Sequence, residues 1–70
     1  METMAMENLV TCLELCTELE SLMDQDREEF SRCITGEIRQ KYADAADGAK
    51  ERLLQLKSEL QQLQELLMLS

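Results

Sequence analysis

The chain has 70 residues, and its 15 acidic side chains against seven basic ones give a net charge of −8. A chain this short forms a single domain with a thin core, because a domain of about 60 residues buries only about 60% of the surface that its unfolded chain exposes. The negative charge disfavours nucleic acid and anionic lipid as partners, since both would be repelled. We therefore expect a protein partner and no bound nucleic acid.

The composition favours an all-α chain without covalent or metal support. There is no proline and there are only two glycines. Chains of this size usually need a disulfide, a metal ion or oligomerisation for stability. Cys12 and Cys16 lie one helical turn apart, where bridging is unfavourable, and the sequence has no histidine and no Cys-x-x-Cys pair. We expect no disulfide, metal or cofactor, and we interpret the cysteines as small apolar core residues.

The sequence also bears on the cellular compartment. It has no stretch of about 18 apolar residues and does not open with a basic region followed by an apolar one. We therefore expect no membrane insertion and no secretory signal, and a cytosolic protein with reduced thiols. Residues 1–30 carry nine acids against one base, whereas residues 31–70 carry six of each. The acidity belongs to the first part of the chain.

The first predicted element is a helix over about residues 7–23, after a frayed start at residues 1–6. Val10 and Leu15 widen its apolar stripe, so the helix is expected to contact more than one neighbour. The apolar residues at one-face helical spacing are Leu9, Cys12, Leu13, Cys16, Leu19, Leu22 and Met23.

The second predicted element is a helix over about residues 27–45. The apolar pattern stops at Asp24, and Asp26 followed by Glu29 three residues later has the arrangement of a capping box, which marks a helix start. Gly48, after Asp47, predicts a left-handed C-cap residue and a turn. The apolar residues of this helix are Phe30, Cys33, Ile34, Ile38 and Tyr42.

The third predicted element is a helix over about residues 49–69 that carries a leucine seam. Its leucines alternate by three and four residues, which places them on one side of a helix: Leu53, Leu56, Leu60, Leu63 and Leu67. Burial of each leucine is worth about 1.5–3 kcal/mol, so another helix must cover this seam. The cover comes from the same chain, from a second copy or from a different protein.

A two-helix arrangement explains the pattern equally well. The leucine seam extends backward through Ala49, Ala46 and Tyr42, which predicts one helix over residues 37–69. The chain would then bend at Thr35–Gly36, and residues 7–34 and 37–69 would form an antiparallel hairpin. Both arrangements are all-α with coiled-coil-like packing, and they place the turns at Asp24–Asp26 and Asp47–Gly48, or at Thr35–Gly36.

The candidate partner-binding surface is the leucine seam together with the C-terminal end. Leu66–Leu69 is apolar around a full helical turn, so one covering helix cannot bury all four residues. Such a patch is typical of a docking surface, and a frayed or self-associated end is the alternative. The predicted partner-binding residues are Leu53, Leu56, Leu60, Leu63, Leu66, Leu67, Met68 and Leu69.

The charged residues do not indicate an enzyme. General acid–base catalysis requires a shaped, water-poor pocket that a short helical chain can hardly build, so we expect no catalytic residues. The bases are interleaved with acids along the second half of the chain, which favours internal salt bridges over a phosphate-binding stripe. Glu37 and Lys41, four residues apart, are an example.

Two resemblances to protein families bear on function. Residues Met23–Phe30 and Arg39, after a leucine-rich helix, resemble the start of the small flagellar export chaperones of the FliT kind, although Arg27 stands where that family usually has tryptophan. In size, acidity and hairpin pattern the whole chain is similar to the short co-chaperones of type III secretion, of the YscE or EscE kind. This second resemblance implies pairing with a larger, repeat-built chaperone that keeps a needle subunit soluble before export.

These observations lead to two hypotheses about function. We expect a non-enzymatic helical binding protein, namely a small cytosolic chaperone or co-chaperone of a type III secretion or flagellar export system. It would shield apolar helices of a partner, either another chaperone subunit or an export substrate. The alternative is a homodimeric four-helix bundle in which two hairpins cover each other, as a structural or regulatory module.

Overall fold

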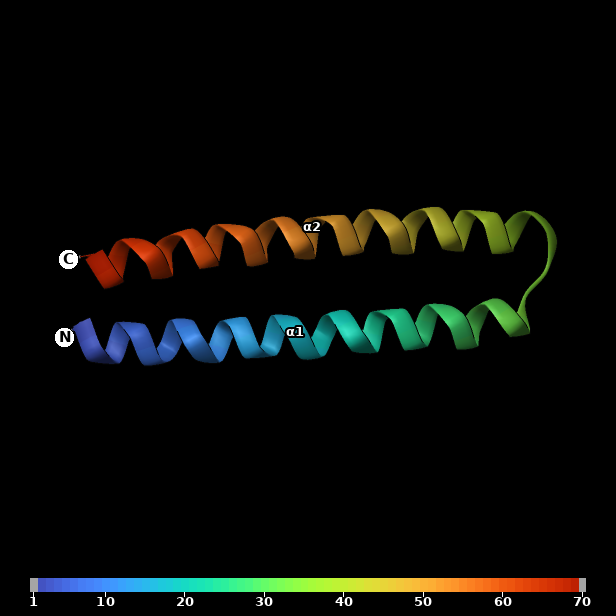
Figure 1. Ribbon diagram of the computed structural model, residues 1–70. Helices are drawn as coiled ribbons and strands as arrows, with labels where there is room; N and C mark the ends of the chain where they lie inside the picture. The colour runs from blue at the N-terminus through green and yellow to red at the C-terminus, as the bar shows by residue number, and fades with distance from the viewer. Residues whose placement is uncertain (1, 70) are drawn as a thin grey trace.

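The computed structural model describes residues 2–69, and these form two α-helices. Helix α1 spans Glu2–Cys33 and helix α2 spans Gly36–Leu69. The helices run antiparallel side by side, so both ends of the chain lie at one end of the molecule and the turn lies at the other (Figure 1). The Cα atoms extend over 52 × 15 × 12 Å. The predicted all-α helical hairpin is confirmed.

The turn occupies Ile34 and Thr35, and Gly36 makes it possible. Gly36 has a φ of +71°, in the left-handed region that side chains disfavour and glycine tolerates. The guanidinium of Arg39 then reaches back, and its Nε and Nη2 donate to the carbonyl oxygen of Ser31, with an Nε–O distance of 3.0 Å. This carbonyl lies in the last turn of α1, where carbonyl oxygens have no hydrogen-bond donor within their own helix. A side chain of α2 therefore satisfies the end of α1 and stabilises the turn.

The breaks predicted at Asp24–Asp26 and Asp47–Gly48 are wrong. Both positions lie inside continuous helices, so the three-helix arrangement over residues 7–23, 27–45 and 49–69 is replaced by the hairpin alternative. Asp26 caps no helix start, and Gly48 has no positive φ. The apolar pattern lapses there because the two helices meet through charges: Lys50 pairs with Asp24, and Arg27 pairs with Asp47.

The start of the chain also differs from the prediction. Helix α1 begins at Glu2, so residues 2–6 are helical and not frayed. Met1, the remaining residue of the predicted frayed segment, lies outside the described residues.

The helices pack along one row of residues each, which we call the interface rows. Both rows alternate by three and four residues, as in a coiled coil, and every member is buried or half-buried. Among the described residues only Leu9, Cys16 and Leu53 are buried rather than half-buried, at 7–8% exposure. The rows are Met6, Leu9, Leu13, Cys16, Glu20 and Met23 on α1, and Ala46, Lys50, Leu53, Lys57, Leu60, Gln64 and Leu67 on α2. The core is thin, as the chain length predicts.

Two glycine substitutions distinguish the turn from the helix interior. Gly36→Ala is expected to destabilise the hairpin by about 1–2 kcal/mol, because a side chain at this φ is strained although nothing lies within 4 Å of the added Cβ. Gly48→Ala is expected to stabilise it by about 1 kcal/mol, because alanine is the better helix former. The added Cβ would meet only the guanidinium of Arg52, at 3.8 Å. Urea denaturation followed by circular dichroism measures both changes, and a loss of stability in Gly48→Ala would contradict an unbroken α2.

Candidate interaction face

Each helix carries a second row of residues, one position before each interface position. A step of one residue turns by about 100° around a helix, so this row lies beside the interface row. In an antiparallel pair the two second rows fall on the same side of the hairpin. We call them together the open face. On α2 the row begins near the turn with Ala45, which is exposed, and Ala49, which is half-buried. The other members are all exposed: Ala5, Asn8, Cys12, Leu15, Leu19 and Leu22 on α1, and Arg52, Leu56, Glu59, Leu63 and Leu66 on α2.

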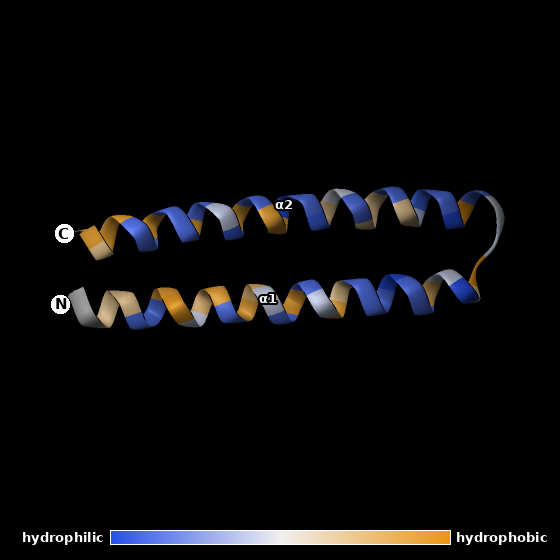
Figure 2. Ribbon diagram, in the orientation of Figure 1, coloured by the Kyte–Doolittle hydropathy of each residue, from blue (hydrophilic) through white to orange (hydrophobic). Residues whose placement is uncertain are grey.

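A groove confirms that the two rows share one side. Ala5 and Cys12 from α1 line it together with Leu63 and Leu66 from α2, and its walls are almost entirely apolar. The groove runs along the half of the hairpin that holds the two ends of the chain. Figure 2 shows apolar residues gathered in the N-terminal half of α1 and at the C-terminal end of α2, whereas α1 is mostly hydrophilic near the turn.

The opposite side of the hairpin carries more polar and charged side chains. A groove there is lined by Val10, Leu13, Glu14, Thr17 and Glu18 from α1, and by Lys57, Gln61 and Gln64 from α2. Its apolar residues are thus interleaved with charged and amide side chains, whereas the groove of the open face is lined almost entirely by apolar atoms and suits contact with another apolar surface.

The leucines of the open face keep a large exposed fraction. Leu15, Leu19 and Leu22 on α1 are 58%, 48% and 54% exposed. On α2 the open-face leucines Leu56, Leu63 and Leu66 are 48%, 50% and 62% exposed, whereas Leu53, of the interface row, is 8% exposed. The hairpin thus buries one apolar stripe of each helix and leaves a neighbouring stripe uncovered.

The predicted partner-binding residues divide into three groups. Leu53, Leu60 and Leu67 belong to the interface rows, and for Leu53 and Leu60 the prediction of a partner contact is corrected to a contact with α1. Leu67 is half-buried in its row and also lines the groove of the open face. The open face contains Leu56, Leu63 and Leu66. Met68 and Leu69, 72% and 84% exposed, lie at the end of α2 outside the open face. The α1 half of the open face was not predicted as a site, although the wide apolar stripe of that helix is its signal.

The cysteines also separate into different environments. Cys16 is buried in the interface row, as predicted for a core residue. Cys12 and Cys33 are exposed, which corrects the core assignment for these two. Cys33 Sγ donates to the carbonyl oxygen of Glu29 at 3.5 Å, within its own helix. The described residues contain no group of histidine, cysteine and acidic side chains placed to hold a metal ion.

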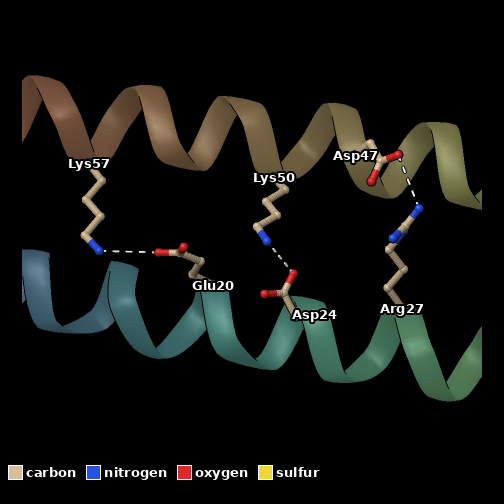
Figure 3. A network of polar contacts seen from close by, with 6 residues as sticks. All are labelled: Glu20, Asp24, Arg27, Asp47, Lys50 and Lys57. Atoms are coloured by element: carbon tan, nitrogen blue, oxygen red, sulfur yellow. Dashed lines mark hydrogen bonds and ion pairs between the residues drawn. The ribbon is translucent and has the colours of Figure 1, made fainter.

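Three ion pairs between the helices fix how they lie against each other (Figure 3). Lys57 Nζ lies 3.3 Å from Glu20 Oε2, and this is the least exposed pair. Arg27 Nη2 lies 3.3 Å from Asp47 Oδ2. Among the described residues Glu37 and Lys41 form no ion pair, so that expected bridge is wrong, and the one pair within a helix joins Glu28 to Arg32. The interleaved charges mainly join one helix to the other.

The third of these pairs changes the acidity of a lysine. Lys50 Nζ donates a hydrogen bond of 2.6 Å to Asp24 Oδ1, and this bond raises the pKa of Lys50 above its ordinary value of 10.5. Partial desolvation lowers the pKa, and the nearby charges of Asp24 and Glu20 raise it further. Because the folded pKa is raised, the contribution of the pair is complete below pH 10.5 and is lost as the pH rises through the folded pKa.

Comparisons of the chain with protein-family models, curated proteins and solved structures give no match. Neither helix, over the described residues, has an apolar stretch long enough to cross a membrane. The open face is therefore the feature of this molecule from which a function can be inferred.

The Lys50–Asp24 pair predicts a specific pH dependence. Asp24→Asn is expected to lower the free energy of unfolding near neutral pH, and the difference from the wild-type protein is expected to shrink above about pH 10.5, where Lys50 loses its proton. Urea denaturation at about pH 8 and about pH 11.5 measures this difference. Asp26→Asn is the control, because Asp26 makes no ion pair among the described residues. A pH-independent effect of Asp24→Asn would contradict the pair.

The division of the leucines predicts unequal costs of truncation. Leu53→Ala is expected to destabilise the hairpin by about 2–4 kcal/mol, because it leaves a cavity in the thin core. Leu69→Ala is expected to change the stability by less than about 0.5 kcal/mol, since that side chain lies in solvent. Thermal and urea denaturation of both variants measure the difference. Similar costs for the two would mean that the C-terminal end is packed in solution.

Proposed function

We propose that this protein is a non-enzymatic interaction module that covers apolar helices of another protein with its open face. The observation that carries the proposal is the set of half-exposed leucines that α1 and α2 bring to one side of the hairpin. Full cover of six such leucines is worth about 5–9 kcal/mol before the cost of association. A binding surface of this kind needs no catalytic group.

The shape of the open face suits a helix. Two antiparallel helices leave a groove along their length, and a third helix fits such a groove through side chains at positions i, i+3, i+4 and i+7. The leucine spacing on both walls repeats with the same period. The preferred ligand is therefore an amphipathic helix with an apolar stripe, rather than an extended peptide or a small molecule.

The cellular role that we propose is that of a cytosolic chaperone or co-chaperone of a type III secretion or flagellar export system. It is supported by the features that the chain shares with those small proteins: short length, acidity and a helical hairpin. The partner is another helical chaperone subunit or an export substrate whose apolar helix needs cover. Glu14 and Glu18 line the groove on the other side, where their charges keep a complex hydrated.

A matched pair of variants tests this proposal. The ligand is a fluorescent synthetic helix of about 21 residues, with leucine at heptad core positions and lysine elsewhere. Leu63→Glu, in the open face, is expected to weaken binding at least about tenfold, because it places a charge in the apolar groove. Gln62→Glu adds the same charge one residue away, outside the open face, and is expected to leave binding unchanged. Fluorescence anisotropy measures both dissociation constants.

The charges of these variants strengthen the test. Each variant adds a negative charge that attracts the basic peptide, so weaker binding in Leu63→Glu would have to come from the loss of apolar contact. Circular dichroism is expected to show the same helical content in both variants, because residue 63 lies outside the interface rows. Equal binding by the wild-type protein and both variants would refute the open face as the binding surface.

A further inference from the structure

We infer that a second copy of the chain covers the open face when no other partner is bound, in an antiparallel four-helix bundle whose two turns lie at opposite ends. The inference rests on the proposed function, because it takes the open face to be a binding surface. Each hairpin would lie face down on the other, α1 against α1 and α2 against α2. The twofold axis would cross the helices near the middle of the hairpin.

The position of the axis follows from the structure. Lys57 pairs with Glu20, and one residue earlier on each antiparallel helix the levels diverge by only about 3 Å, so Leu56 and Leu19 lie close to one level on the open face. Both leucines lie near the middle of their helices. An axis that passes by these two residues makes the copies overlap over residues 5–33 of α1 and residues 43–69 of α2, about four-fifths of the hairpin.

The overlap is large enough for a stable dimer. The Cα atoms of the hairpin extend over 52 Å by 15 Å, and the overlapping part of this outline has a projected area of about 600 Å² per copy, above the roughly 500 Å² per partner that a specific interface needs. The contact would also be isologous, since the same surface is used by both copies. A single helix from another protein would cover only part of this width.

The charges of the open face set the register of the two copies. Arg52 and Glu59 stand seven residues apart on α2, with Leu56 between them. An axis at Leu56 places Arg52 of each copy opposite Glu59 of the other. An axis at Glu59 would instead bring the two Glu59 carboxylates together. Among the described residues neither side chain has an ion-pair partner, and Arg52 donates to the carbonyl oxygen of Gly48 in its own helix, at 3.4 Å.

The sizes of the α2 side chains also agree with an axis at Leu56. The axis at Leu56 places Leu63 of one copy opposite Ala49 of the other, and Leu66 opposite Ala45. Large side chains thus meet small ones, which is how facing helices reach high packing density. The small residues of α2 lie toward the turn and the large ones toward the end of the chain, so only an antiparallel arrangement matches them.

The α1 helices are compatible with this arrangement. Leu19 meets its own counterpart, and Leu15 of each copy meets Leu22 of the other. Asn8 falls opposite Glu29, which gives an amide donor to a carboxylate acceptor. The least favourable pairing sets Asp26 opposite Cys12, whose thiol is a weak donor. The contact between the α1 helices is therefore mainly apolar at its centre and polar toward its ends.

The high net charge does not oppose the contact directly. Glu7, Glu14 and Glu28 recur at steps of seven residues or multiples of seven on α1, on a different face from the open face. A second copy seated on the open face therefore brings these acids to the outside of the bundle. Salt is expected to change the affinity only modestly, because these charges stay hydrated.

A charge swap tests the dimer and its register together. Sedimentation equilibrium over a dilution series measures the dissociation constant of the wild-type protein, which we expect to be a dimer. Arg52→Glu and Glu59→Arg are each expected to weaken the dimer at least about tenfold, and the double variant Arg52→Glu/Glu59→Arg is expected to restore it to within about threefold. Residues seven positions apart do not touch within one helix, so a monomer has no such rescue. Circular dichroism checks that each variant stays helical.

A cross-linking experiment tests the orientation. Leu19→Cys is introduced into a protein in which Cys12, Cys16 and Cys33 are replaced by Ser, Ala and Ser. A short thiol cross-linker is expected to join this variant into a covalent dimer, because the axis brings residue 19 onto its counterpart. With the turns at the same end, Leu19 would face Leu56 instead, and Leu19→Cys alone would give no cross-link, which would overturn the antiparallel arrangement.

The outcomes separate this inference from the proposed function. A wild-type protein that stays monomeric at all concentrations would overturn the dimer, and if it still bound the synthetic helix through the open face, the proposed function would stand. A dimer that ignores the single charge variants would overturn the register at Leu56. Dimerisation with rescue in the double variant would establish both the second copy and its placement.

Discussion

The ion pairs between α1 and α2 are the contacts on which the rest of the structure depends. Each is partly exposed and screened by water, so it contributes little to stability and its main effect is geometric. Lys57, Glu20 and Lys50 occupy positions where a coiled coil usually has apolar residues. A slip of one helical turn would separate both Lys57 from Glu20 and Lys50 from Asp24. The register that they set is also what brings the two halves of the open face to the same level. In a fold with so few buried side chains, the charged pairs thus define the open face by setting the register of the helices.

The same contacts explain what the sequence could and could not predict. The all-α class, the leucine-rich last helix and the wide apolar stripe of the first helix are local patterns, and they were predicted correctly. The number of helices was not decided, because Asp24–Asp26 has the same local chemistry as a helix start whether or not a lysine on another helix meets it. Gly36 and Gly48 were equally acceptable as turn residues, and only one adopts the left-handed conformation. Contacts between the two helices decide the number of helices and the position of the turn, and a local sequence pattern does not contain these contacts.

The interaction site was half predicted for a related reason. The leucine seam mixes two rows that are one residue apart, since Leu53, Leu60 and Leu67 face α1 while Leu56 and Leu63 do not. Lys57 and Gln64 complete the interface row, and no search for apolar periodicity would select them. Cover by α1 therefore satisfies only part of the seam. If a second copy and an amphipathic helix both use the remainder, they compete, and the strength of self-association sets the threshold that any other partner must exceed.

The three cysteines lie in different environments, so their thiol reactivities report on different parts of the molecule. Cys12 lies in the open face, Cys16 lies between the helices and Cys33 ends α1 at the margin of the hairpin. The rate at which a thiol reagent alkylates Cys12 thus follows the occupancy of the open face, whereas alkylation of Cys16 requires the helices to part. One alkylation time course, analysed by mass spectrometry of the peptides, therefore gives the two rates separately. The rate at Cys12 measures association through the open face, and the rate at Cys16 measures local opening of the hairpin, both in the unaltered chain.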